Sequence, residues 1–437
     1  MIARALIPPN PFDKELQVLP QINTGNTGFM ILCASLVMLM TPGLAFFYGG
    51  LMHRKNVLGV MIQSFVSMGW TTVLWFLFGY SMCFGPSVHG IIGNPFTHAL
   101  LRGIDLQSLY QGNVTLGIPT FVHVAYQMMF AIITPALITG AFANRITFKA
   151  YMWFLTFWLI CVYFPFCHMV WHPDGILAQW GVLDYAGGIV VHNTAGIAAL
   201  ASILYVGKRK IIDHTPHSIP LVALGTGLLW FGWYGFNAGS EFQVDSVTTS
   251  AFINTDVSAS FAAVTWLVIE WMNEKQPKFV GLLTGAVAGL ATITPAAGYV
   301  SPAIAALIGV MAGIVCYYAV ALKNKLGWDD ALDVWGVHGV GGMIGIIFLG
   351  LFANKAWNPN IVTNGLLTGG GFSFFGKQVA AVAISTVWAF VFTYGMLWLI
   401  DRVTPVVVDD NVQAKGLDMG LHGETAYTDD THVHDAI

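Results

Sequence analysis

Long apolar segments separated by short polar loops run through almost the whole chain. Eleven of these segments are long enough to cross a bilayer as a helix, which takes about 20 apolar residues. We expect transmembrane helices at 28–50, 56–84, 119–142, 149–171, 184–207, 217–238, 250–272, 279–296, 302–322, 332–353 and 375–400. The pattern therefore predicts an all-α polytopic membrane domain over 28–401, with an outer N-terminal tail at 1–27 and a cytoplasmic tail at 402–437.

The basic residues are distributed unequally between the two alternating sets of loops. With the N-terminus outside, the inner set contains thirteen: Arg54, Lys55, Arg145, Lys149, Lys208, Arg209, Lys210, Lys275, Lys278, Lys323, Lys325, Arg402 and Lys415. The outer set contains five: Arg4, Lys14, Arg102, Lys355 and Lys377. Because cytoplasmic loops carry the excess of Lys and Arg, we predict an N-terminus outside and a C-terminus inside. An odd number of spans also requires the termini to lie on opposite sides.

The composition indicates the same class of protein. Hydrophobic residues make up 56% of the chain and charged residues 9%, whereas about a quarter of the residues are charged in soluble domains. The mean hydropathy is +0.68. The function is therefore expected to lie in the helical bundle, with neither enzymatic activity nor nucleic-acid binding. The five cysteines lack metal-ligand spacing, so we expect no disulfide, no metal centre and no cofactor.

Two histidines in the middle of apolar spans share one local frame. His192 and His338 each follow a valine and precede a small residue at +3, a glycine at +4 and a small residue at +7. These positions lie on or beside the helical face of the histidine. The two frames are five spans apart, and because five is odd, the two copies have opposite orientations in the membrane. We expect inverted repeats at about 28–207 and 217–353, with an eleventh helix at about 375–400 outside the duplication.

An ionisable group at this depth is costly and usually lines a cavity or a pathway. A neutral imidazole has one donor and one acceptor and titrates near neutral pH, so two of them could bind a small polar molecule or relay a proton. Two alternatives remain. The histidines could hydrogen-bond across helices and only hold the bundle together, or they could be axial ligands of a haem. The matching frames favour a pathway.

Five segments carry longer motifs. They are PGLAFFYGGL at 42–51, DYAGG at 184–188 leading to Val191-His192, WFGWYGFNAGS at 230–240, DVWGVHG at 333–339 and GLDMGLHGE at 416–424. These motifs resemble the ammonium transporter family, which includes the Amt, Mep and Rh proteins. The resemblance covers nearly the whole length, and the Trp-rich sixth-span motif and the tail are closer to bacterial-type ammonium transporters than to the Rh branch.

The resemblance implies an outer vestibule that binds the substrate. Ammonium would lie against the aromatic face of Trp171, a contact worth about 0.5–2 kcal/mol, beside the hydroxyl of Ser240. Tyr126 and Phe130, one helical turn apart, would form part of an aromatic wall, and a buried Asp184 would orient the site and favour a cation. Without the resemblance, Trp171 is interpreted as an interfacial anchor and Asp184 as a helix N-cap.

The resemblance also implies a gate and a pore below this vestibule. Phe130 and Phe236 match two phenyl rings that close the vestibule, and Trp233 matches a pore-lining indole. His192 and His338 would line a narrow pore that conducts neutral ammonia. Whether the proton crosses as well is left open, and we favour net movement of the ammonium charge.

The expected function is transport of ammonium or ammonia into the cell across the plasma or inner membrane, with methylammonium as a surrogate substrate. The resemblance further implies a homotrimer with one pore per subunit, embedded in membrane lipid. It also implies a P-II-type signalling protein as a partner at the cytoplasmic face. The alternative function is an ammonium sensor that conducts little and signals through its cytoplasmic tail.

Overall fold

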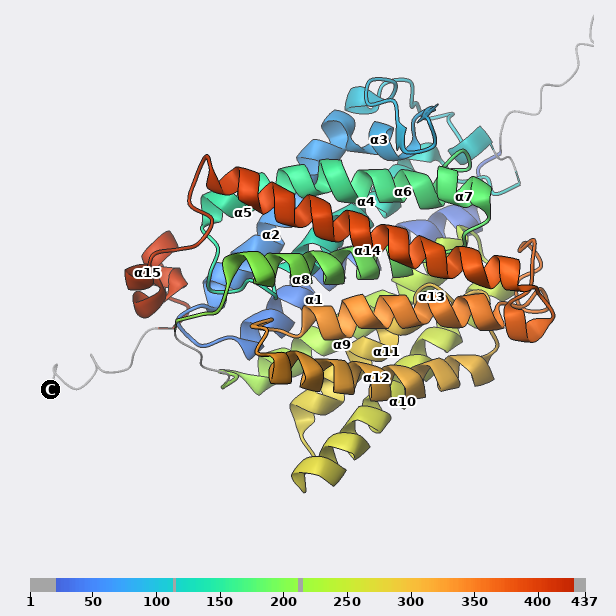
Figure 1. Ribbon diagram of the computed structural model, residues 1–437. Coiled ribbons are helices and arrows are strands. Elements are labelled where there is room, and N and C mark those ends of the chain that lie inside the picture. The colour runs from blue at the N-terminus through green and yellow to red at the C-terminus, as the bar shows by residue number, and fades with distance from the viewer. Residues whose placement is uncertain (1–20, 113–114, 211–214, 428–437) are drawn as a thin grey trace, which may run out of the picture.

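The computed structural model describes residues 21–112, 115–210 and 215–427, which form a bundle of long helices whose axes run in the same general direction (Figure 1). Within this described part of the chain, ten helices are long and apolar enough to span a membrane, and Phe279–Ile293 is a shorter apolar helix. Each of the eleven predicted spans therefore corresponds to a helix. The predicted all-α polytopic fold is confirmed.

The first half of the chain supplies five spans. Their segments are α1 (Thr24–Leu51); α2, η1 and α3 (Val57–Leu74, Trp75–Gly79 and Tyr80–Phe84); α4 (Thr120–Ile138); α5, η4, α6 and α7 (Phe148–Trp158, Leu159–Tyr163, Phe164–Trp171 and Ile176–Trp180); and η5 with α8 (Gly188–Asn193 and Thr194–Val206). A two-stranded antiparallel ribbon, β1 (Ser87–Val88) with β2 (Ile92–Gly93), lies in the long loop after α3.

The second half supplies five more spans and is followed by the eleventh. The segments are α9 with η6 (Ile219–Ala238 and Gly239–Glu241), α10 (Ser246–Glu274), α11 (Phe279–Ile293), α12 (Pro302–Leu326), η7 with α13 (Trp335–Gly339 and Val340–Phe352), α14 (Phe372–Asp401) and, in the tail, α15 with η9 (Asp410–Lys415 and Asp418–His422). Most ends agree with the prediction to within a few residues. Helix α11 ends at Ile293, earlier than expected; Pro295, which has no backbone N–H with which to continue the helix, follows its C-cap Thr294.

Both histidines lie in π-helical segments, which the sequence pattern did not predict. Segment η5 ends one residue after His192, and η7 ends one residue after His338. A π turn accommodates an extra residue in the helix and occurs frequently at functional sites. The same irregularity at the same place in both halves extends the similarity of the two frames from sequence to backbone.

The first spans of the two halves, α1 and α9, pack closely against each other. A Cβ atom on Gly225 would lie 2.3 Å from the nitrogen of Phe47, and one on Gly235 would lie 2.9 Å from the carbonyl oxygen of Cys33. Only glycine permits this approach, which is typical of membrane helices. Because contact positions rise along α1 as they fall along α9, the two helices run antiparallel, as corresponding spans of inverted repeats do.

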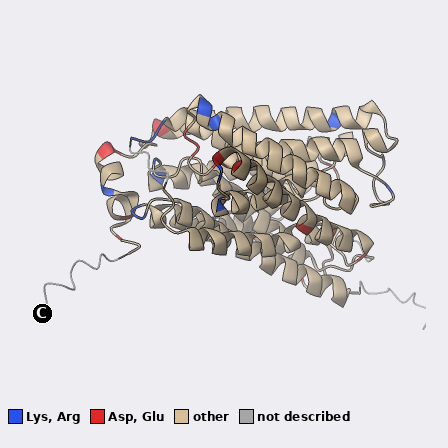
Figure 2. Ribbon diagram, turned by 90° about the horizontal axis from the view of Figure 1, so that it is seen from below, with Lys and Arg blue, Asp and Glu red and all other residues tan. Residues whose placement is uncertain are grey.

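The Lys, Arg, Asp and Glu residues fall mainly toward the ends of the helices, and few lie along the middle of the bundle (Figure 2). Helix α15 of the tail lies at one end, and α7, which precedes the loop to the fifth span, lies at the opposite end (Figure 1). This arrangement agrees with the predicted topology, in which the tail and that loop are on different sides. Which end faces the cytoplasm stays a prediction.

The tail folds back onto the bundle. The Asp418 carboxylate accepts the N–H of Gly59 at 2.8 Å near the start of α2, and the Asn56 side chain accepts the N–H of Leu417 at 2.8 Å. The predicted division into 1–27, 28–401 and 402–437 stays a prediction, and α1 begins slightly inside the first of these ranges. Residues 1–20 and 428–437 of the two tails lie outside the described residues.

Candidate transport pathway

A cavity of about 410 Å³, called here the upper cavity, lies where α6 and α9 end. Trp171, Ser240, Phe130 and Asp184 all line it, so the structure brings together four of the five predicted vestibule residues. The Trp171 indole donates its Nε1–H to the carbonyl oxygen of Asp184 at 3.0 Å. Its ring stands edge-on to Phe130, with centroids 5.7 Å apart and an interplanar angle of 85°. A cation in this cavity therefore meets aromatic rings and a hydroxyl group.

Tyr126, the fifth predicted vestibule residue, lies behind the wall of the upper cavity. Its side chain is fully buried. The hydroxyl lies 2.9 Å from the carbonyl oxygens of both Gly235 and Phe236, to which it donates, and 3.2 Å from Oγ of Ser240. Tyr126 therefore holds the last turn of α9 and the Ser240 hydroxyl in place, while its predicted contact with substrate stays a prediction.

Phe130 and Phe236 form the boundary between two cavities. Their ring centroids are 4.2 Å apart with an interplanar angle of 37°, and both side chains are buried. Phe130 lines the upper cavity, whereas Phe236 lines a second cavity of about 610 Å³, called here the lower cavity. Because the rings are in contact, a hydrated ion cannot pass between the cavities unless a ring moves.

The Asp184 carboxylate is surrounded by backbone N–H groups. Oδ1 accepts two of them at 2.9 and 2.7 Å, and Oδ2 accepts two more at 2.8 and 3.2 Å; the donors are Gly187, Gly188, Ile189 and Val190. These are the free N–H groups at the start of η5, where the helix dipole favours a negative charge. Asp184 therefore anchors the segment that carries His192, as the N-cap interpretation predicted.

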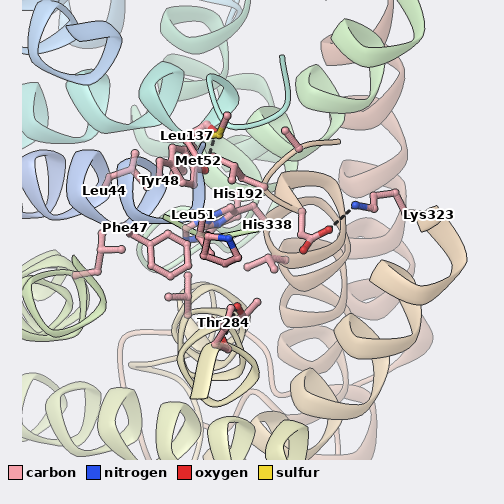
Figure 3. Close-up of a pocket in the computed structure, with 18 of the residues that line it drawn as sticks. Leu44, Phe47, Tyr48, Leu51, Met52, Leu137, His192, Thr284, Lys323 and His338 are labelled. Atoms are coloured by element: carbon pink, nitrogen blue, oxygen red, sulfur yellow. Dashed lines mark hydrogen bonds and ion pairs between the residues drawn. The ribbon is translucent and has the colours of Figure 1, made fainter. Parts of the chain in front are cut away.

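His192 and His338 contact each other in the lower cavity (Figure 3). Their Nδ1 atoms are 3.3 Å apart, and the rings are nearly parallel, with an interplanar angle of 16°. A hydrogen bond between two Nδ1 atoms contains one proton, so one ring donates from Nδ1 and the other accepts there. The two Nε2 atoms then differ as well, one being an acceptor and the other a donor. The pair can offer both functions to a small polar molecule while both rings stay neutral.

Trp233 completes the wall beside this pair. Its ring stacks on His192 with centroids 5.5 Å apart, and its Nε1–H donates to Oγ1 of Thr294 at 2.8 Å. Trp233 also lines the lower cavity, as the resemblance implied. Because the rings of His192 and His338 contact each other directly, no haem iron fits between them. The geometry is incompatible with the two histidines as axial ligands of one haem.

The helices that carry the histidines cross at very close range. A Cβ atom on Gly196 would lie 2.0 Å from the nitrogen of Gly339, and one on Gly342 would lie 2.9 Å from Cβ of His192. Each +4 glycine therefore makes room for the histidine segment of the other half. The contact positions rise along one of these helices as they fall along the other, and the contacts are reciprocal, as expected for inverted repeats related by a two-fold axis.

The far end of the lower cavity is lined by paired charges. Asp329 accepts from Arg209 at 2.7 Å and lies 3.5 Å from Arg145. Burial alone would raise the pKa of the Asp329 carboxyl, but the two guanidinium groups hold it below its usual value. Lys323 pairs with Asp333 at 2.5 Å (Figure 3). These acids are therefore balanced by neighbouring cations.

Several residues of the upper cavity were not predicted from the sequence. They are Glu241, Tyr185, Tyr299 and members of the segment 358–362. An acidic residue at the end of an apolar span is itself a signal of function, and Glu241 directly follows Ser240, so it could have been recognised. The other residues come from loops far apart in the sequence, and no local pattern places them at one cavity.

Comparisons with known proteins identify the family. Residues 28–427 match the profile described as Ammonium Transporter Family. The chain belongs to this family. A putative ammonium transporter from Methanothermobacter thermautotrophicus is 45% identical over 93% of this chain and 99% of the relative. The ammonium transporter of Bacillus subtilis is 42% identical over the same shares of the two chains.

Solved structures agree with this membership of the ammonium transporter family. The crystal structure of Candida albicans Mep2 is 33% identical, covers 90% of this chain and 88% of that chain, and has a TM-score of 0.83. A structure named Sensor Amt Protein is 28% identical, covers 90% of this chain and 97% of that chain, and has a TM-score of 0.81. As a family member, the chain is a multi-pass protein of the cell membrane that transports ammonium and is not an enzyme. The contact between the two histidines fits a twin-His pore.

Proposed function

We propose that ammonium enters the upper cavity, loses its proton at the Phe130–Phe236 contact and crosses the lower cavity as ammonia. One observation carries the proposal: this ring contact separates a cavity lined by Trp171 and Ser240 from a cavity that contains the histidine pair. The first cavity has groups that stabilise a cation, whereas the pair in the second can stay neutral. The substrate is therefore expected to change its charge between them.

The first step is capture of the ammonium ion. The Trp171 face attracts the cation by about 0.5–2 kcal/mol, and Ser240 supplies an acceptor oxygen in place of a lost water molecule. Ser240 donates to the carbonyl oxygen of Phe236 at 2.9 Å, so a lone pair of its hydroxyl oxygen remains for the ammonium ion. Tyr126 and Asp184 act as positioning residues in this step.

The second step is dehydration at the Phe130–Phe236 contact and transfer of one ammonium proton to the acceptor Nε2 of the histidine pair, since the His192 ring stacks against Phe236. Rings in contact offer no replacement for a hydration shell, so passage favours the neutral molecule. Potassium resembles ammonium in radius but has no proton to release. Potassium is therefore expected to stop at the ring contact, and methylammonium is expected to pass slowly as a surrogate.

The third step is passage along His192 and His338. Their complementary tautomers offer ammonia a donor and an acceptor, and the shared proton between the Nδ1 atoms provides a route for proton transfer. Trp233 holds the His192 ring from the side. We propose that the proton follows this route, so that the net transfer is one ammonium charge into the cell.

We also propose the N-out, C-in orientation, a homotrimer with one pore per subunit, and binding of a P-II-type signalling protein at the cytoplasmic face. The orientation is supported by the thirteen-to-five distribution of basic residues. The oligomer and the partner are supported by membership of the family and by the tail, which is docked on the bundle near Gly59.

A second candidate function is ammonium sensing with little flux, which the similarity to the Sensor Amt Protein favours. The two functions differ in their turnover. Purified protein in liposomes is expected to give a sustained ammonium-dependent current if it is a transporter. Binding of ammonium with negligible current identifies the sensor.

The pore is tested with His192→Leu and His338→Leu together, measuring ammonium and potassium currents in proteoliposomes. The double variant should lose the ammonium current or its selectivity over potassium, because no group remains to accept the proton. The control is His89→Asn, an exposed loop position with φ of 55°, which asparagine tolerates. Unchanged current and unchanged selectivity in the double variant would refute the relay.

A further inference from the structure

Glu241 is an acidic residue of the upper cavity that the transport steps above do not use. It is the last residue of η6 and follows Ser240 directly. It is half-buried and lines the same cavity as Trp171, Ser240 and Tyr185. Its carboxyl group therefore lies in the cavity proposed to receive ammonium.

This carboxylate has little compensation from the protein. Among the described residues that line the upper cavity there is no lysine or arginine, and none of the salt bridges in the described part of the chain involves Glu241. The Nε2–H of Gln243 reaches it at a long 3.4 Å, whereas the same group donates to Asp245 at 2.9 Å. The Tyr185 hydroxyl also interacts with this carboxylate, but Tyr185 and Gln243 are both neutral, so no positive side chain among the described residues pairs with the charge of Glu241.

The position of Glu241 is also unfavourable for a purely structural acid. It follows the C-terminal end of α9, where the helix dipole repels a negative charge. The charge of Asp245 lies close by, and partial burial adds a further cost. A cation in the upper cavity removes these costs, because it supplies the missing positive charge.

Asp184, the other acid of this cavity, differs in its contacts. Both of its oxygens accept two backbone N–H groups each, so no acceptor position is left for a ligand. The Glu241 carboxylate has fewer donors, namely the Tyr185 hydroxyl and the distant Nε2–H of Gln243, and no backbone N–H of the described residues is among them. Glu241 is therefore the acid of this cavity that has acceptor positions left for a ligand, and Ser240, the preceding residue, lines the same cavity.

We propose that Glu241 binds the ammonium ion directly in the upper cavity and determines its affinity, together with Trp171 and Ser240. This inference rests on the proposed function of the cavity. A carboxylate that receives a cation here strengthens binding by about tenfold, equivalent to about 1.4 kcal/mol. It acts on capture of the ion and not on the ring contact or the histidine pair below.

The test is a series of ammonium chloride concentrations applied to proteoliposomes that contain the full-length protein or Glu241→Gln. The half-saturating ammonium concentration should rise about tenfold, while the maximal current at saturating ammonium stays within about twofold. The matched control is Asp174→Asn, which removes an exposed charge near the same end of the bundle and lies three residues after Trp171. The control should keep the half-saturating concentration of the unchanged protein.

Three results would overturn the proposal. The first is an unchanged half-saturating concentration in Glu241→Gln. The second is an equal rise in Asp174→Asn, which would indicate a general surface charge effect. The third is a lower midpoint of thermal unfolding together with a lost maximal current, which would show a structural role. If the unchanged protein itself gives no ammonium-dependent current, the proposed transport function fails instead, and ammonium binding by the two proteins in detergent still compares their affinities.

Discussion

Replacing Asp184 by asparagine tests whether this residue anchors a helix or contacts the substrate. The amide keeps one acceptor oxygen, which can retain two of the four backbone N–H bonds, while its NH₂ group faces the other two N–H groups. Each buried N–H left without an acceptor costs about 1–3 kcal/mol, so the substitution costs about 2–6 kcal/mol. We expect the midpoint of thermal unfolding of the purified protein to fall by about 2–7 °C.

The assay is thermal unfolding in detergent, followed by tryptophan fluorescence, together with the ammonium current in proteoliposomes. Asp184→Asn should lower both the unfolding midpoint and the maximal current, because η5 and therefore His192 lose their fixed position. Asp174→Asn, with a side chain that is 69% exposed, should change neither. An Asp184→Asn protein with the original midpoint but without ammonium current would refute the reasoning, since Asp184 would then act on the cation itself.

Two further predictions concern the crossing of the histidine helices and Asp330, a buried acid in the loop at the far end of the lower cavity. Gly196→Ala should lower both the ammonium flux and the midpoint of thermal unfolding, because the new Cβ would lie 2.0 Å from the backbone of Gly339. The control is Gly395→Ala, whose Cβ would have no atom within 4 Å and which should change neither quantity. Equal effects of the two substitutions would contradict the close crossing. Burial raises the pKa of Asp330 to about 6, despite the nearby Lys323, so folding binds a proton and the midpoint should fall as pH rises from 4 to 6. In Asp330→Asn the midpoint should no longer fall over this pH range, because the variant lacks the group whose protonation stabilises the folded protein by about 3 kcal/mol. The same pH dependence of the midpoint in Asp330→Asn and in the unchanged protein would contradict the prediction.

The spans and the twin histidine frames could be predicted because the signals for them are local. A helix in lipid needs a continuous apolar run, so each span appears in the sequence as an uninterrupted segment. The +4 glycines are visible for the same reason: Gly196 and Gly342 each keep a fixed spacing from a histidine. The π-helical backbone at both histidines could not be predicted, because the spacing of residues around them contains no signal for an extra residue in a helical turn.

The wall of the upper cavity was less predictable because it depends on how distant segments pack. Tyr126 and Phe130 are one turn apart on α4, and either could face the cavity. In the structure the Tyr126 hydroxyl points toward α9 and donates to carbonyl oxygens at the end of that helix, whereas Phe130 lines the cavity. Tyr299 and Asn358 reach the cavity from loops more than 100 residues beyond α6 in the sequence, as its lining shows. No single-sequence pattern encodes such a meeting.

We propose that the chemistry of the pathway changes at the Phe130–Phe236 contact and that this change accounts for selection by charge as well as by size. Above the contact, Trp171 and Glu241 favour a cation, which holds ammonium in its charged form. Below the contact, the histidine pair shares one proton between two nearby nitrogens. A cation there would be repelled if the pair had taken up a further proton, and it would find no counterion if the pair were neutral. Ammonium can meet both conditions by releasing a proton at the boundary. An alkali ion of the same radius cannot, so we expect it to stay in the upper cavity, above the rings.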